Sequence, residues 1–185
     1  MTRLNSRLPA VVCAGLACLL AAFAVGCGGG ERETSGFEGE FVRAGDALYQ
    51  VQLTRLLNPR SRPDDQLLRG QMPLPPGQSY LAVFLKITNK GSRDYSPPRD
   101  MKVVDTEGNE YLPLDATQSG FGLDFGTPLA PGESAPLPSS PAAEGPDGAA
   151  MVLFRLKTQS ATDNLPLVLE VPNGGQEVSR IRLDV

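Results

Sequence analysis

The fold of this chain is decided by residues 80–114, which read YLAVFLKITNKGSRDYSPPRDMKVVDTEGNEYLPL. The first ten residues alternate between two faces as in a β-strand, and one face is entirely aliphatic, formed by Leu81, Val83, Leu85 and Ile87. Burying four such side chains contributes roughly 6–12 kcal/mol before entropy is counted, which is comparable to the net stability of a whole domain. We therefore expect residues 79–89 to form a central strand.

The second half of this stretch predicts a β-hairpin. Asn89-Lys90-Gly91 is a turn sequence, and Pro97-Pro98 prevents the chain from continuing as a strand. Residues 101–105 and 110–114 then read as two strands joined by Thr106-Glu107-Gly108-Asn109, whose glycine supplies the positive φ that such turns need.

Weaker strand signals, separated by turn residues, occupy the rest of the chain. The first, at 47–56, should place Tyr49, Val51 and Leu53 on one face. Loops are expected at 58–78, with Leu67 and Leu68 pinning it to the core, and at 136–148. The remaining strands are expected at 149–157, 166–171 and 177–183.

This pattern predicts an all-β domain over residues 45–185. About seven strands with turns between them, and no helical period sustained over three turns, favour an immunoglobulin-like antiparallel β-sandwich without substantial helix. A small closed barrel is the alternative.

Residues 1–26 have the layout of a secretory signal peptide. Arg3 and Arg7 form a basic start, and residues 8–25 are uncharged and mostly apolar. The end of this segment resembles a bacterial lipobox, in which the cysteine after Gly26 would be lipidated and become the new N-terminus. This predicts that Cys27 anchors an exported domain to a membrane. An uncleaved signal anchor is the alternative, because 18 apolar residues are at the lower limit for spanning a bilayer.

A flexible tether is expected between the anchor and the domain. Residues 27–44 begin with a glycine-rich, charged run that has no periodicity, as such a tether should be. The domain would then lie on the extracytoplasmic face of the cell envelope.

Composition excludes several kinds of chemistry. The chain has no histidine, and its three cysteines are all at or before Cys27, so the exported domain has no ligands suited to zinc or copper and no Ser-His-Asp or Cys-His arrangement. Of its 17 basic residues two leave with the leader, and the remaining 15 against 21 acidic residues give a net charge of −6. This charge argues against a nucleic-acid or anionic-lipid partner. No cofactor and no metal are expected.

A family resemblance rests on the order of several turn motifs. Thr88-Asn89-Lys90-Gly91, residues 103–111, Leu129-Ala130-Pro131-Gly132-Glu133 and residues 152–154 occur in that sequence. In this order they resemble the domain-of-unknown-function family of bacterial surface lipoproteins with a telokin-like immunoglobulin fold. The resemblance covers residues 45–184. It implies a fold and a location, and it implies no biochemical activity.

Carboxylates are the remaining candidates for catalysis or metal binding. A glycosidase needs only two acids at a set separation, and the candidates are Asp94, Asp100, Asp105, Glu107 and Glu110. Acids in turns are mostly solvated, and the chain has no tryptophan to stack on a sugar. Residues 105–110 also place oxygen ligands at alternate positions, but they lack the length and bidentate acid of a calcium loop. A plain hairpin turn is favoured.

Four aromatic residues are candidates for a binding surface. Tyr80 and Phe84 lie on the face of the central strand opposite its aliphatic row, and Phe121 and Phe125 lie in a glycine-rich segment at 116–127. Exposed aromatics on a sandwich can mark a partner site. The favoured alternative is that the segment at 116–127 or the one at 58–78 folds over Tyr80 and Phe84.

The sequence therefore predicts a lipid-anchored, extracytoplasmic binding or interaction module that is not an enzyme. Its partner would be an unidentified envelope protein or a small ligand. The alternatives are a small-ligand carrier with an apolar pocket between or at the end of the sheets, and a carboxylate-dependent hydrolase. A pocket of a few hundred Å³ lined by residues 121–125 would favour the carrier, and two convergent acids in a cleft would favour the hydrolase.

Overall fold

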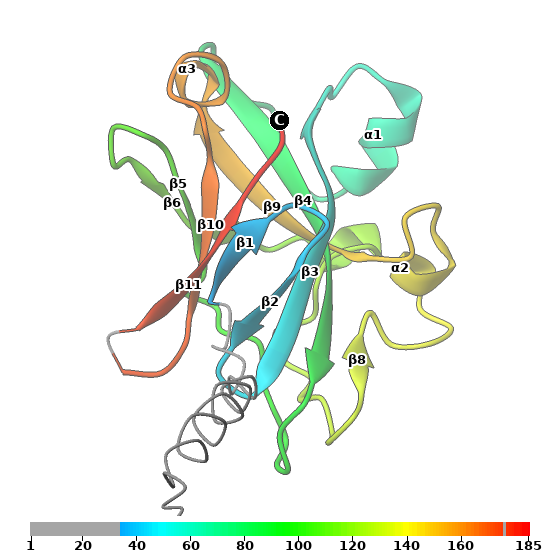
Figure 1. Ribbon diagram of the computed structural model, residues 1–185. Helices are drawn as coiled ribbons and strands as arrows, with labels where there is room; N and C mark the ends of the chain where they lie inside the picture. The colour runs from blue at the N-terminus through cyan, green and yellow to red at the C-terminus, as the bar shows by residue number, and fades with distance from the viewer. Residues whose placement is uncertain (1–33, 176) are drawn as a thin grey trace, which may run out of the picture. The chain divides into compact units, whose positions relative to one another are not determined.

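Two β-sheets pack face to face in the computed structural model, which describes residues 34–175 and 177–185 (Figure 1). One sheet contains, in spatial order, β1 (Ser35–Phe37), β11 (Val178–Arg182), β10 (Val168–Pro172), β5 (Lys102–Val104) and β6 (Glu110–Tyr111). The other contains β2 (Phe41–Ala44), β3 (Ala47–Leu57), β4 (Gln78–Asn89), β9 (Ala150–Lys157) and β7 (Pro113–Leu114), and β8 (Ser134–Ala135) pairs with the end of β4. Paired strands are antiparallel except β1 and β11, which run parallel.

The predicted all-β sandwich is thus confirmed, and its two separate sheets distinguish it from a barrel. The described residues form eleven strands, more than the seven expected. The additional ones, such as β1, β2 and β8, are two to four residues long, too short to show an alternating pattern.

The predicted central strand is β4, which lies between β3 and β9 in the six-stranded sheet. Its aliphatic row is fully buried in the core between the two sheets; the members of this row are Leu81, Val83, Leu85 and Ile87. Tyr80, Ala82 and Phe84 of its other row are buried as well, in a second apolar cluster on the outer face of the sheet, whereas Lys86 of the same row is exposed. The hairpin of β10 and β11 also forms as predicted.

Only short helices occur in the described residues. They are α1 (Arg62–Leu67), α2 (Pro141–Glu144), α3 (Thr158–Thr162) and the 3-10 turn η1 (Thr117–Ser119). The first two lie within segments expected to be loops. Leu67 and Leu68 are buried in the outer-face cluster, so they pin the segment at 58–78 as predicted.

A β-bulge in β3 overturns part of the expected facing of this strand. The pairing with β4 shifts between Val51 and Leu53: Val51 opposes Leu85, and Leu53 opposes Phe84. Tyr49 and Val51 face the core between the sheets, whereas Leu53 packs in the outer-face cluster. The prediction for Leu53 was wrong because one extra residue in a strand reverses every side chain that follows it.

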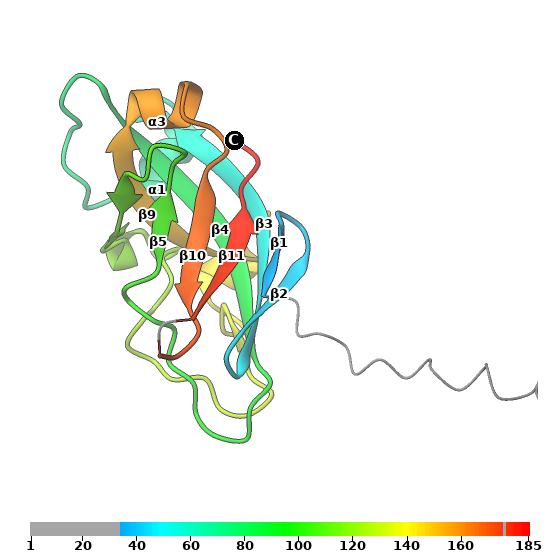
Figure 2. The same cartoon turned by 60° about the vertical axis from the view of Figure 1, so that its left-hand side comes forward.

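The predicted flexible tether at 27–44 is wrong from Ser35 onward. β1 joins the five-stranded sheet beside β11, and β2 joins the six-stranded sheet beside β3. Val42 and Ala44 are each 1% exposed in the core. β1 and β2, joined by a short turn, therefore close one edge of the sandwich (Figure 2).

The predicted hairpin at residues 101–114 forms and then divides between the sheets. β5 pairs with β6 around the predicted turn, but β7 pairs with β9 in the other sheet. Leu112 lies at the crossing between them and is 62% exposed. The edge made by β6 and β7 is opposite the edge made by β1 and β2.

The predicted signal peptide at 1–26 and the predicted lipidation of Cys27 lie outside the described residues. Within the part that is described, no helix has the length and apolar character needed to cross a membrane.

Candidate functional site

Two of the four predicted surface aromatics lie in the outer-face cluster and are almost fully covered. Tyr80 and Phe84 are each 3% exposed. They pack with Leu67 and Leu68 from one covering segment and with Phe121 from the other. Both segments that the sequence offered as covers thus lie over β4.

Phe84 and Phe121 come together at a pocket on the outer face of the six-stranded sheet, as the sequence suggested. We call it the outer-face pocket. It has a volume of about 340 Å³, and it is lined by Arg55, Pro63, Gln66, Leu67, Phe84, Phe121, Ala142, Gly145, Pro146, Asp147 and Ala149. Most of this lining is apolar, with Arg55 and Asp147 supplying charge.

The position of Arg55 above Phe84 is fixed by α1. The Arg55 guanidinium carbon lies 5.9 Å from the centroid of the Phe84 ring, within cation–π range. Its Nη1 donates to Oδ1 of Asp64 at 2.7 Å, and Oδ2 of Asp64 accepts from the Asn58 backbone amide at 2.8 Å. Asp64 is 5% exposed. The ion pair of Arg55 and Asp64 therefore holds the Arg55 guanidinium over the Phe84 ring.

Phe125 lies elsewhere, in a flank pocket of about 370 Å³ that it shares with Arg99, Leu123, Asp115 and Asp124. The Arg99 guanidinium carbon is 5.6 Å from the Phe125 ring centroid. Tyr80 lines neither pocket, and its hydroxyl donates to the Met72 carbonyl. The four predicted aromatics therefore do not form one site.

Two acids share the flank pocket, which is the arrangement that would favour a hydrolase. A hydrogen bond from the Thr117 hydroxyl lowers the pKa of Asp115, and one from the Thr127 hydroxyl lowers the pKa of Asp124. A general acid in a glycosidase needs a raised pKa instead. Both carboxylates therefore stay ionised and stabilise the turns in which they lie.

Asp105 is also committed to a turn. Its Oδ1 accepts from the backbone amides of Glu107 and Asn109 at 3.0 and 2.9 Å, and its Oδ2 accepts from Nδ2 of Asn109 and of Asn164 at 2.8 and 3.2 Å. Burial raises the pKa of Asp105, but hydrogen bonds from Ser160, Asn109 and Asn164 outweigh this effect and hold the pKa well below its usual range. The carboxylate serves as the structural centre of a hairpin turn.

The other predicted acids do not converge. Asp94, Asp100 and Glu107 are exposed, and Glu110 pairs with Lys102 on the neighbouring strand. In the described residues, no group of three or more Asp, Glu, His or Cys side chains is placed to hold a metal ion.

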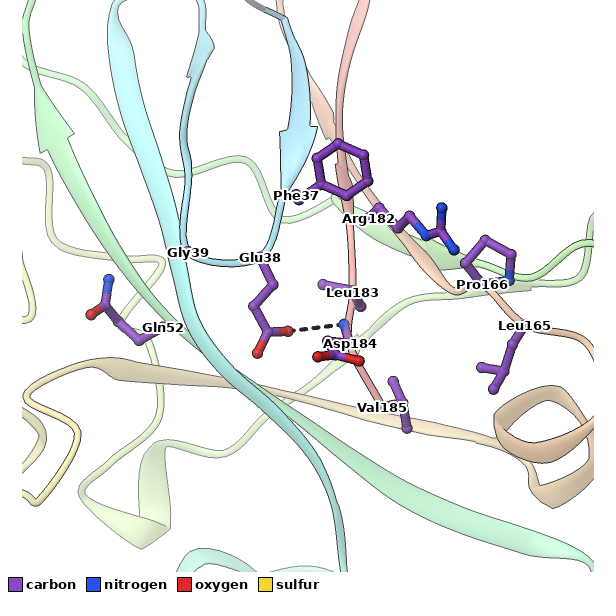
Figure 3. A pocket seen from close by; sticks show the side chains of 10 residues that line it. All are labelled: Phe37, Glu38, Gly39, Gln52, Leu165, Pro166, Arg182, Leu183, Asp184 and Val185. Carbon is purple, nitrogen blue, oxygen red and sulfur yellow. Dashed lines mark hydrogen bonds between the residues drawn. The ribbon is translucent and has the colours of Figure 1, made fainter.

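A third pocket lies beside the C-terminus and was not predicted. This end pocket has a volume of about 590 Å³ and is lined by Phe37, Glu38, Gly39, Gln52, Leu165, Pro166, Arg182, Leu183, Asp184 and Val185 (Figure 3). The Glu38 side chain joins β3 to the C-terminal residues at this pocket, because its carboxylate accepts from the Thr54 and Asp184 backbone amides at 3.0 and 3.1 Å. The signal in the sequence that could have indicated this pocket is Phe37, within an otherwise glycine- and glutamate-rich segment.

Comparisons with known proteins agree with the fold. No family model matches the chain, and no curated protein matches it. An uncharacterized β-sandwich protein from Clostridium difficile is similar in structure, with 14% identity, a TM-score of 0.50, and coverage of 81% of this chain and 93% of that one. The yjhA protein from Bacillus subtilis is similar at 11% identity, with a TM-score of 0.50 and coverage of 81% and 99%. Likeness at this identity shows the β-sandwich fold alone.

Proposed function

We propose that this chain is a lipid-anchored, extracytoplasmic β-sandwich that binds a ligand or a partner and does not catalyse a reaction. The leader and Cys27 support the anchor, and the order of the turn motifs supports kinship with the telokin-like surface lipoproteins. The binding part of the proposal is supported by the outer face of the six-stranded sheet, which the segments at 58–78 and 116–127 cover only in part. This partial cover leaves an apolar pocket whose floor is Phe84 and whose wall is Phe121.

The lining of this pocket suits an apolar group with a polar end. Ligand pockets of this kind are mostly hydrophobic, with a few placed polar groups that fix orientation. Phe84, Phe121 and Ala149 offer the apolar surface. Arg55, held by Asp64, offers donors at one side, so an apolar molecule or side chain with an acceptor group would fit.

A small-ligand carrier is the second candidate, and the pocket volumes favour it. The outer-face, flank and end pockets have volumes of about 340, 370 and 590 Å³, within the range of small-molecule sites. Residues 121–125 line the first two only in part: Phe121 lines one, and Leu123 to Phe125 line the other. A carrier would retain a solvent-extractable small molecule on purification, whereas an interaction module would crosslink to an envelope protein.

Binding of an apolar anionic dye, 1-anilinonaphthalene-8-sulfonate, tests the outer-face pocket directly. Phe121→Ala should weaken the dye by about tenfold, because losing one aromatic contact removes roughly 1.5 kcal/mol or more. Leu112→Ala, at an exposed apolar site that does not line the outer-face pocket, is the control and should leave binding unchanged. Equal binding by both variants and the wild type, all with cooperative unfolding, would contradict the site.

A further inference from the structure

The two exposed phenylalanines of the described chain lie at the two ends of the turn that joins β1 to β2. Phe37 is 56% exposed and Phe41 is 60% exposed, and they flank the turn Glu38-Gly39-Glu40 between β1 and β2. The other described phenylalanines are buried or half-buried. We call residues 37–41 the aromatic tip.

Further exposed apolar side chains lie beside this tip. Leu165 and Val185 are each 40% exposed, and with Phe37 they line the end pocket (Figure 3). Phe37, Phe41, Leu165 and Val185 make up four of the seven large exposed hydrophobic side chains in the described residues. Exposed apolar groups that gather in this way indicate a contact surface.

The carboxylates of the tip are held by backbone amides, and the Phe37 ring lies beside a cation. Oε2 of Glu40 accepts from the Phe37 amide at 2.8 Å, and both carboxylate oxygens of Glu38 are held by backbone amides. The Arg182 guanidinium carbon lies 5.9 Å from the Phe37 ring centroid. An aromatic ring beside a guanidinium suits the region of a bilayer where apolar chains meet phosphate headgroups.

The length of chain before the tip decides what can cover it. Seven residues lie between Cys27 and Ser35, and the eight residue-to-residue steps span at most about 26–29 Å when the chain is fully extended. Since the sandwich begins at Ser35, the predicted tether shortens, and a lipid on Cys27 would hold the tip close to the bilayer. Such tethering raises the effective concentration of the tip at the membrane surface.

We propose that the aromatic tip, together with Arg182, docks on the membrane that holds Cys27 and orients the sandwich there. This inference rests on the proposed lipid anchor. Phe37 and Phe41 enter the interface between headgroups and acyl chains, and the opposite edge, with Leu112, faces away from it. Apolar insertion drives the contact, because the exported domain is acidic overall.

The test uses the absence of tryptophan from the chain. Phe41→Trp and, separately, Leu112→Trp each introduce a single fluorophore at positions of nearly equal exposure, 60% and 62%, on opposite edges. The full lipidated protein is placed in phosphatidylcholine vesicles with and without brominated acyl chains. We expect a blue-shifted emission and a loss of intensity with brominated lipid for Phe41→Trp, and neither effect for Leu112→Trp.

Three results would overturn the proposal. If Phe41→Trp floats with the vesicles but shows neither a blue shift nor quenching, the anchor holds and the membrane contact is wrong. A blue shift without quenching would show that another protein copy covers the tip. If the protein does not float with the vesicles, the anchor itself fails, and the proposed location fails with it.

Discussion

Two turns are each held by a single polar side chain: the turn after β4 by Asn89, and the turn between β5 and β6 by Asp105. Asn89 is fully buried. Its Nδ2 donates to the carbonyls of Arg93 and Leu129 at 2.7 and 2.8 Å, and its Oδ1 accepts from the Gly91 amide at 2.9 Å. The turn after β4 was predictable from Asn89-Lys90-Gly91, but the tie to Leu129 was not, because it joins residues 40 positions apart.

Asp105 should make the stability of the protein depend on pH. Its pKa is held below the ordinary value in the folded state, so its contribution to stability is complete above the unfolded pKa of about 3.9 and is lost as the pH falls below that value. Asp105→Asn should therefore lower the free energy of unfolding by about 1–3 kcal/mol at pH 6. Urea titrations of both proteins from pH 6 to pH 2 should show this difference shrinking, and a difference that stayed constant would contradict the account.

Phe84 should behave as a core residue. It is 3% exposed, so Phe84→Ala should lower the free energy of unfolding by about 3–5 kcal/mol. Phe41→Ala, the same change at 60% exposure, should cost no more than about 0.5 kcal/mol in solution. Denaturant unfolding measures both. Equal, small effects would mean that the covering segments do not bury Phe84.

At the scale of elements, long strands were predictable and short ones were not. β4 and β9 have twelve and eight residues, and each contains an apolar run long enough to be recognised as a buried strand. β1 and β2 have three and four residues in a segment rich in glycine and glutamate, too short to show a strand period. The pairing of β1 also depends on β11, which is distant in the sequence.

The bulge in β3 explains why the site was only half predicted. Residues 47–56 read as uninterrupted alternation, which would place Arg55 on the same face as Tyr49 and Val51. The extra residue turns Arg55 to the outer face, where it meets Phe84. The meeting of Phe84 with the 116–127 segment was predicted, whereas the cation above it depended on this single irregularity.

Hydrogen exchange should show that the fold begins at Ser35. The amides of β2 that pair with β3 should exchange orders of magnitude more slowly than those of the exposed residues 92–94, because strand amides open only with larger unfolding events. Exchange resolved to short peptides measures this. If residues 41–44 exchanged as fast as residues 92–94, they would belong to a tether after all.

For the whole molecule, two features decide how it would work on a membrane. The aromatic tip lies on the edge formed by β1 and β2. The outer-face pocket lies over β4, on the outer face of the six-stranded sheet. A domain held through its edge would leave the face of that sheet open to the surrounding space. Anchoring and binding would then use separate surfaces.

The mass of the mature protein, recovered from the membranes of cells that express the full chain, tests the central claim most directly. Cleavage before Cys27 would leave 159 of the 185 residues. We expect the mass of this shortened chain with acyl groups added at its N-terminus. The mass of the complete chain, which would indicate a signal anchor, or of a cleaved chain without lipid would contradict it.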